Sequence, residues 1–305
     1  MNRKSMNNLP NTGERLLTES FDRYTVEHLH RYAIAMSLCE NLEVLDIASG
    51  EGYGSNLLSS VAKNVHGVDI SVDAIEHAKA KYVRNNLRYT IGAADNIPLP
   101  AESVDRVISF ETLEHHDLHE EMFAEIKRVL RPGGITMIST PDKLNYSDIP
   151  KQNNEYHVKE LYLEEFRALA QKYFKHVAIL YQDVGYFGVI TPEKPKSYPF
   201  RYYNGDFNHV EINSTIPNPV YNICLASDTD LPEMMISVYS GHLVMEDILK
   251  QLGNATSSNT RLESIHSNLN SEMHNLASSP SYLIGRAITY PYRLIRNVIS
   301  NIKVI

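Results

Sequence analysis

The chain has 305 residues, 43% of them hydrophobic, which is enough for one large domain with an extension or for two small domains. The formal net charge of -8 excludes a surface that is basic overall, so we expect no nucleic-acid partner. Cys39 and Cys224 lie in apolar runs without C-x-x-C spacing, which favours buried thiols over a disulfide scaffold or a zinc site.

Short apolar runs alternate with helical patterns through the first half of the chain. Residues 1–20 are mostly polar and predict a flexible arm, and a helical pattern follows from Phe21 to Cys39. The predicted strands are 44–48, 65–70, 87–92, 104–110 and 135–140, and the helical patterns between them are 55–62, 72–83 and 117–130. This alternation predicts an α/β fold, a parallel sheet with helices on both faces.

The second half of the chain is less regular. A helix is predicted over 158–173 and strands over 176–182 and 220–227, while residues 183–218 between those strands lack periodicity and predict an ordered insertion or lid. Residues 231–280 are predicted to be helical. Their near-heptad positions, Leu262, Ile265, Leu269, Met273 and Leu276, are compatible with a short coiled coil and hence a homo-oligomer.

The run Val44–Gly54, VLDIASGEGYG, takes an apolar strand into a glycine loop and then into a helix. Such a loop presents backbone N–H groups at a helix N-terminus, which suits a nucleotide-like ligand. The dinucleotide fingerprint requires G-x-G-x-x-G or A, but Gly50 and Gly52 are followed by Ser55 at the third position. An NAD-dependent oxidoreductase is therefore disfavoured.

The same run resembles the first motif of class I S-adenosylmethionine-dependent methyltransferases, with Ala48 where that family usually has its first glycine. The resemblance extends over about residues 20–230, with LRPGG before the fifth strand as a further match. It implies S-adenosyl-L-methionine as the cofactor and a Rossmann-like seven-stranded methyltransferase sheet at 21–230, followed by a helical C-terminal tail.

The resemblance also assigns site residues. Asp69 would bind the ribose hydroxyls and Asp95 the adenine amino group, the run 104–115 would border the methyl group, and Arg31 would meet the methionine carboxylate. From the residues alone, Asp69 could instead cap the next helix, and Arg31 could be a solvated charge. The implied cofactor-binding residues are Arg31, Asp46, Ala48, Gly50, Gly52, Asp69, Ile70, Ala94, Asp95, Phe110 and Glu111.

Methyl transfer to a hydroxyl needs a positioned acceptor and a group that removes its proton. His115 follows the fourth predicted strand and His157 precedes the helix after the fifth, so either is a candidate catalytic base, and neither need be one. His115 and His119 are four residues apart and could hold a metal, but histidines at an acidic helix start are more often surface residues. We therefore expect no metal.

The last segment, 281–305, interleaves Arg286, Arg293, Arg296 and Lys303 with aromatic and aliphatic residues. This pattern predicts either a segment lying on an anionic membrane surface or a helix packed on protein. With no apolar run long enough to span a bilayer and no signal peptide, we expect a cytoplasmic protein, and the membrane-surface alternative would place it at the inner face of the membrane.

The run SYLIGRAITYPYRLIRNVI resembles tails of bacterial enzymes that build surface polysaccharides, and GERLLTE and EYHVKELYLEEF resemble their O-antigen and capsule methyltransferases. This resemblance implies O-methylation of a sugar hydroxyl on a small-molecule or glycan acceptor. A quinone or other lipid acceptor stays open, because methyltransferases with the same core act there. So does a non-catalytic cofactor-binding scaffold in a glycan-assembly complex.

Overall fold

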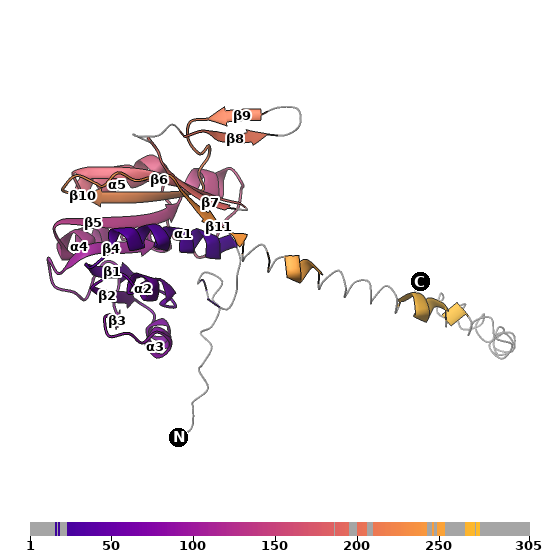
Figure 1. The fold of residues 1–305 in the computed structure, drawn as a ribbon, viewed down its shortest axis with the longest axis horizontal. Coiled ribbons are helices and arrows are strands. Elements are labelled where there is room, and N and C mark those ends of the chain that lie inside the picture. Colours follow the sequence, from indigo (N-terminus) through magenta and orange to yellow (C-terminus); the bar gives the residue numbers. More distant parts are fainter. Residues whose placement is uncertain are drawn as a thin grey trace, which may run out of the picture. The chain divides into compact units, whose positions relative to one another are not determined.

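The computed structural model describes residues 16, 18, 23–185, 187–194, 200–205, 210–242, 246, 249–253, 266–271, 273 and 274 (Figure 1). The chain divides into two units, Met1–Met245 and Glu246–Ile305. The described residues of the second unit are helical, among them 249–253 and 266–271. The predicted basic tail at 281–305 lies outside the described residues, as do most of the predicted arm and part of the heptad pattern.

The first unit contains all the named helices and strands. In chain order they are α1 (Arg23–Leu38), β1 (Glu43–Ile47), α2 (Tyr53–Leu58), β2 (Asn64–Asp69), α3 (Val72–Lys81), β3 (Leu87–Ile91), β4 (Val104–Phe110), η1 (Leu113–His115), α4 (His119–Val129), β5 (Leu130–Pro141), η2 (Leu144–Asp148), α5 (Leu163–Tyr173), β6 (His176–Val184), β7 (Phe187–Pro192), β8 (Tyr202–Gly205), β9 (Val210–Asn213), β10 (Tyr221–Ser227) and β11 (Ser237–Ser240). No helix among the described residues is long and apolar enough to cross a bilayer.

The main sheet is mixed and has nine strands, in the order β11-β7-β6-β10-β5-β4-β1-β2-β3. Strands β1 to β5 pair in parallel, as predicted, and β10, at the predicted strand 220–227, runs antiparallel between β5 and β6. The prediction of seven strands is wrong, because β7 and β11 extend the sheet at one edge.

The two additional strands come from segments that were not predicted to form strands. β7 lies in the predicted insertion at 183–218, and β8 and β9 form a separate hairpin there. β11 lies in the segment 231–280 predicted as helical, so the sheet continues beyond the predicted boundary at 230. β11 has only four residues and alternates half-buried with exposed positions, and so it lacks the apolar run by which the central strands were recognised.

Helices cover both faces of the sheet. On one face, Tyr32 of α1, Leu58 of α2 and Ile75 of α3 belong to one buried cluster. On the other face, Phe123 of α4 and Phe166 of α5 belong to a second cluster. Because β1 to β5 are parallel, their carboxyl ends meet at one edge of the sheet, and the loops that carry the predicted site residues leave from that edge.

Candidate active site

The glycine loop after β1 follows a left-handed backbone path. Ala48 has φ 57°, Gly50 has φ 55° and Gly52 has φ 94°. At Gly52 an added Cβ would lie 2.7 Å from the Cβ of Ala78, and the carbonyl of Gly52 accepts a hydrogen bond of 2.8 Å from the Tyr89 hydroxyl. Conformation and space therefore both require glycine at position 52.

Ala48 is the member of this loop that has a side chain in a conformation suited to glycine. We expect Ala48→Gly to raise the free energy of unfolding by about 0.5–1 kcal/mol, because relief of the left-handed strain of roughly 1–2 kcal/mol exceeds the added entropy of glycine in the unfolded chain. Urea denaturation would measure the change. As a control, Ala80→Gly on the exposed face of helix α3 should lower stability by about 1 kcal/mol. Equal losses in both variants would contradict the expected strain.

Asp69, the last residue of β2, joins the glycine loop to the start of α3. Its Oδ2 accepts a hydrogen bond from the backbone N–H of Gly50 and its Oδ1 one from that of Ser71, both at 2.8 Å. The side chain that caps α3 is that of Ser71, which accepts from the N–H of Ala74. Each carboxylate oxygen of Asp69 can accept a second hydrogen bond, so the residue can support the loop and also bind a hydroxyl.

Asp46, in β1, points away from the solvent and is 1% exposed. Its carboxylate accepts hydrogen bonds from the hydroxyl of Ser55 at 2.6 Å and of Tyr32 at 3.1 Å. Burial is the main cause that raises the pKa of Asp46 to about 7, although these two hydrogen bonds oppose the shift. Asp46 therefore links β1, α1 and α2 beneath the loop.

The raised pKa of Asp46 gives a pH prediction. The folded state binds the proton of this carboxyl more tightly than the unfolded state does. The contribution of protonated Asp46 to the free energy of unfolding is therefore complete below about pH 4 and is lost as the pH rises through about 7. We expect Asp46→Asn, which cannot ionise, to gain stability relative to the natural protein between pH 5 and 8. Thermal unfolding of both proteins across this range measures the difference. A pH-independent difference would contradict the ionisation of Asp46 in this window.

Arg31, in α1, is fully buried, so the interpretation of a solvated charge is wrong. Its Nε donates to Oε1 of Gln182 at 2.6 Å, its Nη1 lies 2.8 Å from Oε1 of Glu111, and its guanidinium carbon lies 4.6 Å from the ring centre of Tyr221. The contact with Glu111 is an ion pair without the alignment of a hydrogen bond. Among the described residues, none accepts a hydrogen bond from Nη2 of Arg31, which leaves a buried cationic donor for a ligand.

Glu111 directly follows β4 and has a left-handed backbone, φ 52°. Its Oε1 accepts a hydrogen bond of 2.7 Å from the hydroxyl of Ser139. Phe110 before it is 6% exposed and packs edge-to-face on Tyr32, with ring centres 5.0 Å apart. The end of β4 is thereby joined to α1, the helix that carries Arg31.

The remaining predicted cofactor residues border the same edge. Ile70, after β2, is 75% exposed, which is unusual for a large aliphatic side chain at the end of a buried strand. Ala94 and Asp95 follow β3 in a turn closed by the bridge between Ala93 and Asn96, and both are half-buried. None of the contacts described for these three residues joins them to Arg31 or Glu111. The three residues therefore lie beyond the carboxyl ends of β2 and β3, whereas Glu111 lies beyond that of β4.

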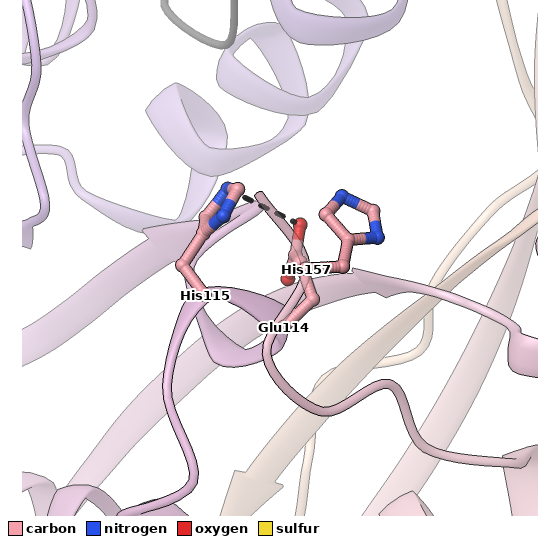
Figure 2. A group of neighbouring side chains, drawn as sticks. All are labelled: Glu114, His115 and His157. Carbon is pink, nitrogen blue, oxygen red and sulfur yellow. Dashed lines mark ion pairs between the residues drawn. The ribbon is translucent and has the colours of Figure 1, made fainter. Parts of the chain in front are cut away.

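The two predicted histidines are brought together. The rings of His115 and His157 lie edge-to-face with centres 5.3 Å apart, on either side of Glu114 (Figure 2). His119 is directed elsewhere: its Nε2 contacts the carbonyl oxygens of Leu113 and His116, so the His115–His119 metal pair considered from the sequence is not formed.

Some residues at the site were not predicted. Glu114 is 1% exposed, and burial together with the charge of Glu111 raises its pKa well above the ordinary value. Gln182 orients Arg31 although it is 151 residues away. Ser49, within the loop itself, has a buried hydroxyl without a hydrogen-bond partner among the described residues. Ser49 was identifiable from its place in the glycine loop, whereas Gln182 had no local signal.

Comparison with known proteins gives a consistent result. Residues 45–138 match the family model described as "Methyltransferase domain". A protein of Mycolicibacterium smegmatis named "Probable S-adenosylmethionine-dependent methyltransferase" is 34% identical over 53% of this chain and 64% of its own length. A protein of Mycobacterium tuberculosis with the same kind of name is 34% identical over 52% of this chain and 58% of its length. A fatty-acid O-methyltransferase of Mycolicibacterium smegmatis is 27% identical over 44% of this chain and 48% of its own length.

The chain therefore spans less than two thirds of the length of these curated relatives. Among solved structures, the complex between the Haloferax volcanii Trm112 methyltransferase activator and a candidate methyltransferase aligns with 17% identity and a TM-score of 0.50, covering 70% of this chain and 92% of the other. At this identity the likeness concerns the fold alone. The fold is thus the Rossmann-like methyltransferase fold with a mixed sheet.

Proposed function

We propose that this chain, which contains a class I methyltransferase domain, is an S-adenosylmethionine-dependent methyltransferase. The proposal rests on the arrangement at the carboxyl ends of the strands. There the left-handed glycine loop is hydrogen-bonded to Asp69 through the N–H of Gly50, and Glu111, which follows β4, forms an ion pair with the buried Arg31. The names of the relatives support the same cofactor, S-adenosyl-L-methionine, which supplies an electrophilic methyl group on a sulfonium.

The residues present fit this cofactor. A carboxylate can accept from Nη2 of Arg31, which lacks a partner among the described residues, and paired hydroxyls can donate to Asp69. The hydroxyl of Ser49 offers a further polar contact in the loop. Ile70 provides an exposed apolar surface that a purine ring would cover, removing that surface from water.

For the acceptor, we propose a sugar hydroxyl, and hence O-methylation in surface-glycan biosynthesis. The acceptor side is assigned to the end of β4 and the segment before α5, where His115, His157 and Tyr146 gather beside Glu114. These groups are polar or aromatic, which suits a hydroxylated ligand better than a hydrocarbon chain. We assign the handling of the hydroxyl proton to the His115–His157 pair.

A lipid acceptor is the second candidate, favoured by a specific observation. The insertion predicted as a lid exposes large apolar side chains, namely Phe187, Tyr203, Val210 and Ile212. A relative is named as a fatty-acid O-methyltransferase. Transfer of isotopically labelled methyl from S-adenosylmethionine into fractionated cell extracts separates the candidates: label in glycans supports the first and label in lipids the second. Cofactor binding without label in any fraction would support the scaffold function.

Binding of the cofactor is tested through Asp69. We expect Asp69→Ala to weaken S-adenosylmethionine binding by about 1–3 kcal/mol, or roughly 5- to 150-fold, because it removes a charged acceptor for two hydroxyls. Isothermal titration calorimetry gives the dissociation constants. Asp73→Ala, in the exposed first turn of α3, is the matched control and should bind like the natural protein. Unchanged affinity in Asp69→Ala would contradict the assignment.

A further inference from the structure

A carboxylate and two imidazoles converge beyond the end of β4. Glu114 and His115 come from η1, and His157 comes from the segment between η2 and α5 (Figure 2). One potential ligand atom from each of the three residues lies within 4.8 Å of the others. Neighbouring ligand atoms of a tetrahedral zinc ion lie about 3.3 Å apart, so the 4.0 Å between Nε2 of His115 and Oε1 of Glu114 would shorten by about 0.7 Å when an ion binds.

Each of the three side chains is oriented through its other polar atom. Nδ1 of His115 lies 3.1 Å from the carbonyl oxygen of Tyr156, and Nδ1 of His157 lies 2.5 Å from Oε1 of Glu160. Since both partners are acceptors, each neutral imidazole carries its proton on Nδ1 and its lone pair on Nε2. Histidines that bind a metal usually donate their other ring N–H to a carbonyl or carboxylate oxygen of this kind.

The carboxylate and the backbone are held in the same way. The hydroxyl of Thr140 donates to Oε2 of Glu114 at 3.1 Å, which directs Oε1 toward His115. The backbone N–H groups of Val158 and Lys159 donate to the carbonyl oxygen of Glu114 at 2.8 and 3.1 Å. The segment that carries His157 is therefore fastened to η1 before any ion binds, and little ordering is left to oppose binding.

We propose that Glu114, His115 and His157 bind a divalent transition-metal ion. Two imidazole nitrogens with one carboxylate oxygen suit Zn²⁺, Co²⁺ or Fe²⁺, whereas Mg²⁺ and Ca²⁺ prefer oxygen ligands alone. The site has three protein ligands, which leaves coordination positions for an exogenous oxygen. The sequence-based expectation of no metal rested on the pair His115–His119 and did not consider Glu114 or His157.

The role of this ion rests on the proposed methyl transfer. An acceptor hydroxyl bound to the ion has a lowered pKa and loses its proton to water. Its oxygen then forms a bond to the methyl carbon, and the carbon–sulfur bond breaks with its electron pair going to sulfur. In this arrangement the two histidines hold the ion and water accepts the hydroxyl proton, so the metal role would replace the direct proton handling assigned to the pair above.

The test uses the full chain without a polyhistidine tag, stripped of metal by a chelator and titrated with Co²⁺. We expect saturable visible absorption bands at one Co²⁺ per chain, displacement by Zn²⁺, and no displacement by millimolar Mg²⁺. His115→Ala and His157→Ala should weaken Co²⁺ binding at least tenfold. Glu160→Gln, a nearly isosteric change in a positioning residue, should weaken it about 10- to 100-fold. His66→Ala, on β2, is the histidine control and should bind normally.

Calorimetry of S-adenosylmethionine binding to the metal-free protein separates the two proposals. Cofactor binding without Co²⁺ bands would overturn the metal site and leave the proposed function intact. Co²⁺ bands without cofactor binding would support the metal site and count against the proposed function. Co²⁺ bands that persist unchanged in the folded Glu160→Gln and His157→Ala variants would also overturn this ligand set.

Discussion

Replacing Gly54 by alanine should lower the free energy of unfolding by about 2 kcal/mol. In α2, an added Cβ at this position would lie 2.0 Å from Cζ of Tyr32. That ring cannot easily move, because it packs edge-to-face on Phe110 and on Tyr53 and its hydroxyl donates to Asp46. Overpacking of this kind typically costs about 1–3 kcal/mol, and the better helix propensity of alanine, about 1 kcal/mol, offsets only part of a clash this close.

Urea denaturation followed by circular dichroism measures this loss. Gly185→Ala is the matched control, since an added Cβ there meets nothing within 4 Å among the described residues, and its stability should change by less than about 0.5 kcal/mol. In a Tyr32→Leu background, the cost of Gly54→Ala should fall, because the ring that blocks the new methyl group is gone. Equal costs in both backgrounds would show that the clash with Tyr32 is not the cause.

Replacing Arg31 by methionine should weaken S-adenosylmethionine binding about 10- to 100-fold. The guanidinium is the buried cation that we assign to the cofactor carboxylate, and a hydrogen bond to a charged group contributes about 1.5–3 kcal/mol. Arg31→Lys should also bind weakly, because one ammonium group cannot reproduce the separate contacts to Gln182, to Glu111 and to a ligand. Calorimetry measures both affinities.

The control for Arg31 must separate lost binding from lost folding, since removing one partner of a buried ion pair can itself destabilise a protein. The double variant Arg31→Met/Glu111→Gln removes the carboxylate that would otherwise be left without its cation. We expect it to be more stable than Arg31→Met and still to bind the cofactor weakly. Arg88→Met, on the exposed face of β3, should bind normally. A folded double variant with natural affinity would contradict the role of Arg31.

The central strands could be predicted because their signal is local. β1, β2, β4 and β10 are buried over most or all of their length, and their short segments rich in apolar residues are typical of strands covered on both faces. β7 and β11, at one side of the sheet, gave no such signal. Both are partly exposed, and their pairing depends on which chain segment reaches that side of the sheet.

The position of the cofactor-binding residues at the carboxyl ends of the strands was predictable for the same reason as the strands. Gly50, Gly52 and Asp69 follow directly from strand ends, and the carboxyl ends of parallel strands meet at one edge whatever the rest of the fold does. The hydrogen bond between Gly50 and Asp69 is a consequence of this geometry.

By itself, the sequence determined the alternation of strands and helices, the glycine loop and its acidic companions, because each of these is encoded by neighbouring residues. Only the tertiary structure decided that Arg31 is buried against Gln182 and Glu111, that His119 contacts carbonyl groups, and that His157 meets Glu114 and His115. These contacts join segments distant in the chain, and they depend on how α1 and the segment before α5 pack on the sheet, which no local pattern specifies.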